Sequence, residues 1–235
     1  MEVSIISEGV TDQIIIEAIV QGLLNDKNIS LNALQPKENE PGGWQLVRSY
    51  CKSKDFKEAL PYTEGLIIIH IDCDVLGTDG VPEDCVINFN NMTINQAFDA
   101  VKAKIIGFIT PNVFNLYSDR IVFAIAINSI ECWLLPLYYS NKRAVANKTS
   151  GCLQALNNEL RKRGFTIDKK DLKYYREISK DLRAEKTIRH CYERNESFAL
   201  FIDSLNLAIA TYPKVSDDAD EPEEAGEAIG IKEAE

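Results

Sequence analysis

The chain has 235 residues, 45% of them hydrophobic, and a formal net charge of −10, so it can bury a substantial core. Its longest apolar runs, such as residues 66–69 and 121–127, are far shorter than the roughly 20 residues that cross a bilayer. The first 20 residues lack the basic, apolar and cleavage-site pattern of a secretory signal. We therefore expect a cytoplasmic protein with no membrane partner.

Charge divides the chain into three parts. Residues 1–141 hold 9 Lys/Arg against 18 Asp/Glu, whereas residues 142–194 hold 15 Lys/Arg against 7 Asp/Glu. Residues 216–235 hold one lysine against nine acids and no aromatic residue, which is typical of disorder. We expect an acidic front domain over 1–141, a basic helical region over 142–215 and an acidic disordered tail over 216–235.

The first part of the chain alternates strand and helix patterns. In order, we expect a strand at 3–6, a helix at 11–24 with Thr11 as its N-cap, a loop at 25–43, an amphipathic element of open type at 44–50, a strand at 66–75, a helix at 93–106 and a strand at 120–127. Continuous apolar strands alternating with helices predict an α/β fold with a parallel sheet covered on both faces.

From residue 131 onward the apolar spacing is helical. The expected helices lie at 131–140, 152–163, 171–183 and 196–210. The basic cluster falls on these helices, so the sequence predicts a helical C-terminal region after the sheet.

Cysteine and histidine residues offer little support for a catalytic or metal site. The six cysteines form no CxxC pair, so neither a zinc site nor a disulfide framework is expected, and only His70 and His190 are present for a histidine-based site. Any catalytic chemistry is therefore expected to depend on carboxylates.

Acidic residues stand at two corresponding strand ends. Asp72 and Asp74 are two positions apart, a spacing that places them on one face of a strand with Cys73 on the other. Glu8 follows the first strand, at the turn into the first helix. The carboxyl ends of parallel strands are where open α/β sheets bind ligands, and oxygen-only ligation suits Mg²⁺. The alternative is a purely structural role, in which these acidic residues cap helices or lie in solvent at the strand ends.

The same residues resemble the signature of the TOPRIM family. Glu8-Gly9-Val10-Thr11-Asp12 before an apolar helix, followed by Ile69-His70-Ile71-Asp72-Cys73-Asp74, is similar to its glutamate-glycine turn and downstream Asp-x-Asp. The threonine and aspartate after the glycine look like the overcoming-lysogenization-defect nucleases and the stand-alone TOPRIM proteins of bacterial phage-defence loci. Three later segments resemble the second group: Gly42-Gly43-Trp44, Asn128-Ser129-Ile130-Glu131-Cys132-Trp133 and Arg194-Asn195-Glu196-Ser197-Phe198.

The resemblance implies roles for the acidic residues. Glu8 would act as general acid or base, Asp72 and Asp74 would hold Mg²⁺ or Mn²⁺, and Asp12 would hold a second ion as in relatives that use two metals. The chain lacks a Walker A sequence, so any partner ATPase would have to be encoded separately.

For each of three further residues, the sequence allows both a structural role and a role in a functional site. Glu131 follows Asn128 by three residues, which fits either a capping box or an additional site residue. His70 lies on the Asp72 face, where a buried hydrogen-bonded histidine is favoured over a neighbour of the metal. His190 is favoured as part of a solvated helix face, with a phosphate contact as the alternative.

The basic region is a candidate nucleic-acid surface. It interleaves positive charge with two aromatic residues that could stack on bases, Tyr174 and Tyr175. Its basic members are Arg161, Lys162, Arg163, Lys169, Lys170, Lys173 and Arg176.

These patterns favour a metal-dependent nuclease acting on RNA or DNA, as a toxic effector of an anti-phage defence system. The alternative is a non-catalytic TOPRIM-like subunit that binds nucleic acid or a partner ATPase. Retention of Glu8 beside both aspartates favours the enzyme, because a structural metal site needs no third acid for proton transfer.

Overall fold

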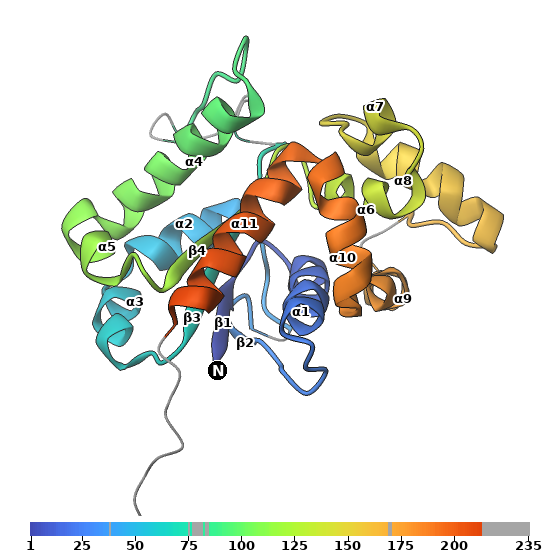
Figure 1. Cartoon of the computed structure of the whole chain (residues 1–235). Coiled ribbons are helices and arrows are strands. Elements are labelled where there is room, and N and C mark those ends of the chain that lie inside the picture. The colour runs from blue at the N-terminus through green and yellow to red at the C-terminus, as the bar shows by residue number, and fades with distance from the viewer. Residues whose placement is uncertain (38, 75, 77–81, 83–84, 169–170, 213–235) are drawn as a thin grey trace, which may run out of the picture.

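A computed structural model shows a four-stranded parallel sheet with helices on both faces (Figure 1). The strands are β1 (Val3–Ile6), β2 (Asn32–Gln35), β3 (Leu66–Asp72) and β4 (Ile121–Ala126), in the order β2-β1-β3-β4. The expected α/β class with a parallel sheet is confirmed. The structure describes residues 1–37, 39–74, 76, 82, 85–168 and 171–212.

Helices make up most of the described chain. Those of the first part are α1 (Val10–Leu24), α2 (Trp44–Lys52), α3 (Lys54–Ala59), α4 (Ile94–Ile109) and α5 (Pro111–Tyr117). After β4 come α6 (Glu131–Tyr138), α7 (Arg143–Ala146), α8 (Cys152–Leu160), α9 (Leu172–Ser179), α10 (Glu185–Cys191) and α11 (Glu196–Thr211). Short 3-10 turns extend several of them: η1 (Leu60–Tyr62), η2 (Arg161–Arg163), η3 (Lys180–Arg183) and η4 (Tyr192–Arg194). The expected helical C-terminal region is confirmed.

Strand β3 separates two hydrophobic cores. Because strand side chains alternate, Leu66 and Ile68 join the core formed with α1, α6 and α11, while Ile67 and Ile69 join the core formed with α2 and α4. All seven β3 residues are buried. The face of Leu66 and Ile68 continues into His70 and Asp72, so the alternation that builds the core also aims these polar side chains toward α1 and α6.

Several local expectations differ from the structure. The expected loop at 25–43 contains strand β2, a short and partly exposed edge strand whose polar sequence gave no strand signal. Thr11 is not an N-cap: Gly9 takes that position without a side-chain hydrogen bond, and Thr11 instead donates to Asp12 over 3.3 Å. Strand β3 ends at Asp72, three residues earlier than expected.

Helices of the basic region pack directly against helix α1 in the N-terminal part of the chain. Helix α1 contacts α9, α10 and η3, and Tyr175 and Ile188 enter the same core as the sheet residues. Gly22 permits this approach, because a Cβ there would lie 2.2 Å from the Leu182 carbonyl oxygen.

Within the described ranges, no helix is both long and apolar enough to pass through a membrane. The expected acidic tail lies outside the described residues.

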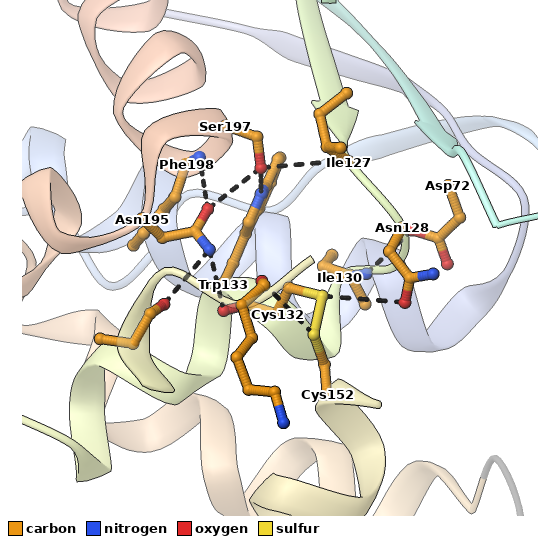
Figure 2. Close-up of a disulfide and its surroundings, with 12 residues drawn as sticks. Asp72, Ile127, Asn128, Ile130, Cys132, Trp133, Cys152, Asn195, Ser197 and Phe198 are labelled. Atoms are coloured by element: carbon orange, nitrogen blue, oxygen red, sulfur yellow. Dashed lines mark hydrogen bonds between the residues drawn. A yellow bond between two sulfur atoms is a disulfide. The ribbon is translucent and has the colours of Figure 1, made fainter. Parts of the chain in front are cut away.

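A disulfide joins Cys132 of α6 to Cys152 of α8 (Figure 2). The expectation of no disulfide was therefore wrong. The two cysteines are 20 residues apart in sequence, and packing of α6 on α8 brings them together, which residue spacing could not reveal.

Loss of this disulfide is expected to lower stability by about 3 kcal/mol, because the cross-link restricts the unfolded chain. Incubating the protein with dithiothreitol should then lower its Tm by on the order of 10 °C. A Cys132→Ser/Cys152→Ser double variant should have the lower Tm with or without reductant. An unchanged wild-type Tm after thiol titration has confirmed full reduction would contradict the expectation.

Candidate metal centre

Glu8 bridges the ends of β1 and β3. Its side-chain Oε1 accepts a hydrogen bond from the Asp72 backbone N–H over 2.8 Å. Its carbonyl oxygen accepts from the Gly43 N–H over 2.7 Å, and a Cβ at Gly42 would lie only 1.9 Å from that oxygen. The glycine pair after β2 therefore lets the backbone pass close enough to fix the turn that carries Glu8.

Asp72 is the last residue of β3 and is 4% exposed. Its Oδ1 accepts a hydrogen bond from the Ile130 backbone N–H over 2.9 Å, which ties it to the start of α6. The same oxygen lies 3.4 Å from His70 Nε2, within ion-pair distance but without hydrogen-bond geometry. The Asp72 carboxylate is thus positioned by the start of α6 and by His70.

His70 lies between two buried carboxylates. Its Nδ1 is 3.8 Å from Asp12 Oδ2, and both side chains are fully buried. That Asp12 oxygen and both ring nitrogens have no hydrogen-bond partner among the described residues. Buried polar atoms are rarely left in this state, so the cluster has spare capacity for a ligand. His70 is buried as expected, and Asp72 Oδ1 at 3.4 Å is the nearer of its two carboxylate neighbours.

Glu131 points into the same cluster from the first turn of α6. It is 5% exposed, and its Oε1 accepts a 2.5 Å hydrogen bond from the Tyr175 hydroxyl. The capping-box interpretation was wrong, because the N-cap of α6 is Ile130 with no side-chain bond. Tyr175 was expected to stack on bases, yet it is 1% exposed, so sequence reasoning missed its contact with the acidic cluster.

Burial and mutual repulsion shift the acidity of these groups. Burial, and then the charge of Asp72, raise the pKa of Glu8 to about 8. Burial is also the main cause that raises the pKa of Asp72 to about 6. Burial alone would lower the pKa of His70, but Asp72 and Asp12 outweigh it and raise that pKa. A cation placed among these carboxylates would relieve the same repulsion.

The metal-free protein is therefore expected to lose stability as pH rises from about 5 to 8. The folded state holds protons on Glu8 and Asp72 that the unfolded chain has released, and the raised pKa of His70 acts in the same direction. Thermal unfolding in EDTA across this range should show a falling Tm, and Glu8→Gln should flatten the fall. A Tm that rises over the range in wild type would contradict the charge assignment.

Asp74 is exposed, in contrast to the buried carboxylates of the cluster. It follows the end of β3, its side chain is exposed, and its N–H donates to the Asn128 carbonyl over 2.9 Å. It lines a pocket of about 360 Å³ at the carboxyl ends of β3 and β4, and Phe89 and Met92 also line this pocket. The same-face argument for the two aspartates does not apply, because the strand ends before Asp74.

A polar network holds α6 against the end of β4 (Figure 2). Ser197 Oγ accepts hydrogen bonds from Trp133 Nε1 over 2.9 Å and from the Ile127 N–H over 3.4 Å. Asn195 Oδ1 accepts from Ser197 Oγ over 3.0 Å and from the Phe198 N–H over 3.1 Å. This network fixes the segment that presents Ile130 to Asp72.

The residues present fit a hard divalent cation in their chemistry. Asp12, Asp72 and Glu8 supply oxygen donors, and the partnerless Asp12 oxygen is an acceptor without a donor. Among the described residues, the structure shows no group of three or more His, Cys, Asp or Glu side chains placed so that it could hold a metal ion.

The basic cluster is partly neutralised by local partners. Lys162 pairs with Glu159 over 2.5 Å and Arg163 with Asp181 over 3.7 Å. Exposed pairs of this kind contribute little stability and exchange readily for other partners. Arg161, Lys173 and Arg176 are also exposed, whereas Lys169 and Lys170 lie outside the described residues. Tyr174 stacks on Phe165 at 5.4 Å between ring centroids.

Comparisons with protein-family models, with curated proteins and with solved structures found no match. The interpretation of the site therefore depends on its geometry and on the motifs that the sequence displays.

Proposed function

We propose that this chain is a TOPRIM-like, Mg²⁺- or Mn²⁺-dependent nuclease whose centre is the carboxylate cluster of Glu8, Asp72 and Asp12. The observation that carries the proposal is the Glu8 to Asp72 hydrogen bond, which joins the two motifs that resemble the TOPRIM signature. The three later segments of that resemblance lie around the same point. Gly42-Gly43 holds the Glu8 backbone, Ile130 holds Asp72, and Asn195 and Ser197 hold the start of α6.

Each residue has a distinct part in this proposal. Asp72 and Asp12 would hold the metal from the buried side, Asp74 from the solvent side, and Glu131 is an additional ligand or a support for it. When bound, the metal would supply an activated water and neutralise charge that develops on a phosphodiester. Glu8 would move the proton, since a carboxyl group whose pKa is raised to about 8 can hold or release one near neutral pH.

The surroundings of the cluster suit an extended phosphodiester substrate. The pocket beside Asp74 is open to solvent and presents Phe89 and Met92, apolar side chains against which a base can pack. The exposed cations of η2 and α9 would attract the phosphate backbone. In the same proposal the protein acts in the cytoplasm as the effector of an anti-phage system, with a partner ATPase supplied by another chain.

The test is incubation of purified protein with labelled RNA and DNA pools in Mg²⁺, Mn²⁺ or EDTA, alone and with the products of neighbouring genes. Metal-dependent cleavage of either pool is the expected result. Binding without cleavage in every condition would instead favour a non-catalytic subunit. The incubations with products of neighbouring genes distinguish that outcome from the lack of an activating partner.

A further inference from the structure

A second pocket, of about 240 Å³, lies between α6 and α10, which are neighbours in the fold (Figure 1). The apolar part of its lining comes from Pro136, Leu137 and Cys191. Its remaining walls carry the polar side chains Ser140, Lys186, Thr187, His190 and Arg194. Helix α6 begins at Glu131, so with a rise of 1.5 Å per residue Leu137 is about 9 Å along the helix from the acidic cluster.

The cations Lys186 and Arg194 and the imidazole of His190 all line this pocket. Lys186, His190 and Arg194 follow one another at intervals of four residues, the spacing that aligns side chains along a helical turn. Their alignment is carried from α10 into the following turn η4, and all three line the same pocket. This is a concentration of positive charge in a protein with a net charge of −10.

Among the described residues, the charges of Lys186 and Arg194 are not balanced by ion pairs of the kind that Arg189 makes on the same helix. Arg189, on another face of α10, lies 2.6 Å from Glu185. By contrast, none of the ion pairs between described residues includes Lys186 or Arg194. Arg194 Nη2 lies 3.2 Å from His190 Nε2, and its Nη1 is buried without a hydrogen-bond partner in the described chain.

A buried guanidinium nitrogen without an acceptor is costly, so an anion that supplies the acceptor would be stabilised there. The arginine fork suits the paired oxygens of a phosphate group, and Lys186 adds a point charge. Hydroxyl groups of Ser140 and Thr187 can donate to the remaining oxygens. The apolar part of the lining offers a surface against which a sugar or base can pack.

We propose that this pocket binds a phosphate ester, through Arg194, Lys186 and His190, as a site separate from the carboxylate cluster. The phosphate belongs to a free nucleotide or to the backbone of a nucleic-acid strand. The site does not depend on the nuclease proposal, because it uses no carboxylate and no metal.

The two histidines of the chain give a direct measurement. The full-length protein, in EDTA at constant pH, is titrated with inorganic phosphate while the imidazole C–H signals are followed by NMR. The His190 signal should move with saturation, and the signal of buried His70 should stay in place. A His190 signal that does not move, or that moves without saturation, overturns the proposal.

Matched variants test the geometry. Arg194→Gln and Lys186→Gln should each weaken phosphate binding by roughly tenfold or more, the scale of a lost charged hydrogen bond. Lys186 is exposed, so its variant tests the site even if Arg194→Gln folds poorly. Arg189→Gln removes one charge from the same helix outside the pocket and should bind as wild type does. Equal weakening by all three would show a general charge effect and overturn the site.

Two further probes distinguish the source of the phosphate. Adenosine monophosphate represents a free nucleotide, and a single-stranded eight-nucleotide RNA without terminal phosphates represents a backbone. Tighter binding of either probe, lost in Lys186→Gln, supports the site and identifies the source. Binding of neither probe overturns it, while metal-dependent cleavage by the carboxylate cluster would be unaffected by that result.

Discussion

Replacing Glu8 with glutamine is expected to lower nucleic-acid cleavage by roughly 10²-fold or more, the scale of lost general acid or base catalysis. Folding should be preserved, because the glutamine side-chain oxygen can still accept the Asp72 N–H that Glu8 Oε1 accepts over 2.8 Å. The amide cannot exchange a proton near neutral pH, and this is the property that the substitution removes. Single-turnover cleavage in Mg²⁺, with any required partner supplied, measures the loss.

The matched control is Glu17→Gln. Glu17 is a partly buried glutamate of α1 that also accepts a backbone hydrogen bond, from the Leu31 N–H over 3.3 Å. It has no part in the acidic cluster, so its variant should cleave at the wild-type rate. If Glu8→Gln and wild type cleave equally and are equally toxic in cells, the nuclease proposal fails and the binding-subunit alternative replaces it.

Asp72→Asn is expected to abolish cleavage and to weaken Mg²⁺ binding, because it removes a charge from the centre of the proposed metal site. The metal-free variant should nevertheless be more stable than wild type above pH 6. Burial raises the pKa of Asp72 to about 6, so its ionised form is disfavoured in the fold. The asparagine oxygen can still accept the Ile130 N–H, which Asp72 Oδ1 accepts over 2.9 Å.

Calorimetric titration with Mg²⁺ and Mn²⁺ and thermal unfolding in EDTA measure these two effects. Asp99→Asn is the control, since it removes one exposed aspartate charge from α4. Asp74→Asn should lower metal affinity without the gain in stability, because Asp74 is exposed. Unchanged metal binding in both site variants would remove these two aspartates from the site.

Much of the fold could be predicted from local pattern. The apolar runs at 66–69 and 121–127 lie in buried parallel strands, and the capping box of Thr93 and Gln96 begins α4 one residue after its expected start. Strand β2 could not be predicted, because an exposed edge strand with a polar sequence is stabilised by pairing with β1 rather than by its own propensity.

Some features of the candidate site could likewise be predicted from the sequence, and others could not. The sequence by itself placed Glu8 after the first strand and Asp72 near the carboxyl end of a later buried strand, because apolar strand patterns are local signals. That these two strands are neighbours was decided by the tertiary structure. Only the tertiary structure decided that Tyr175 contacts Glu131 and that Asp74 is exposed while Asp72 is buried. It also decided the disulfide between Cys132 and Cys152. Such contacts join residues far apart in the chain, and they depend on how helices pack rather than on the pattern within any one of them.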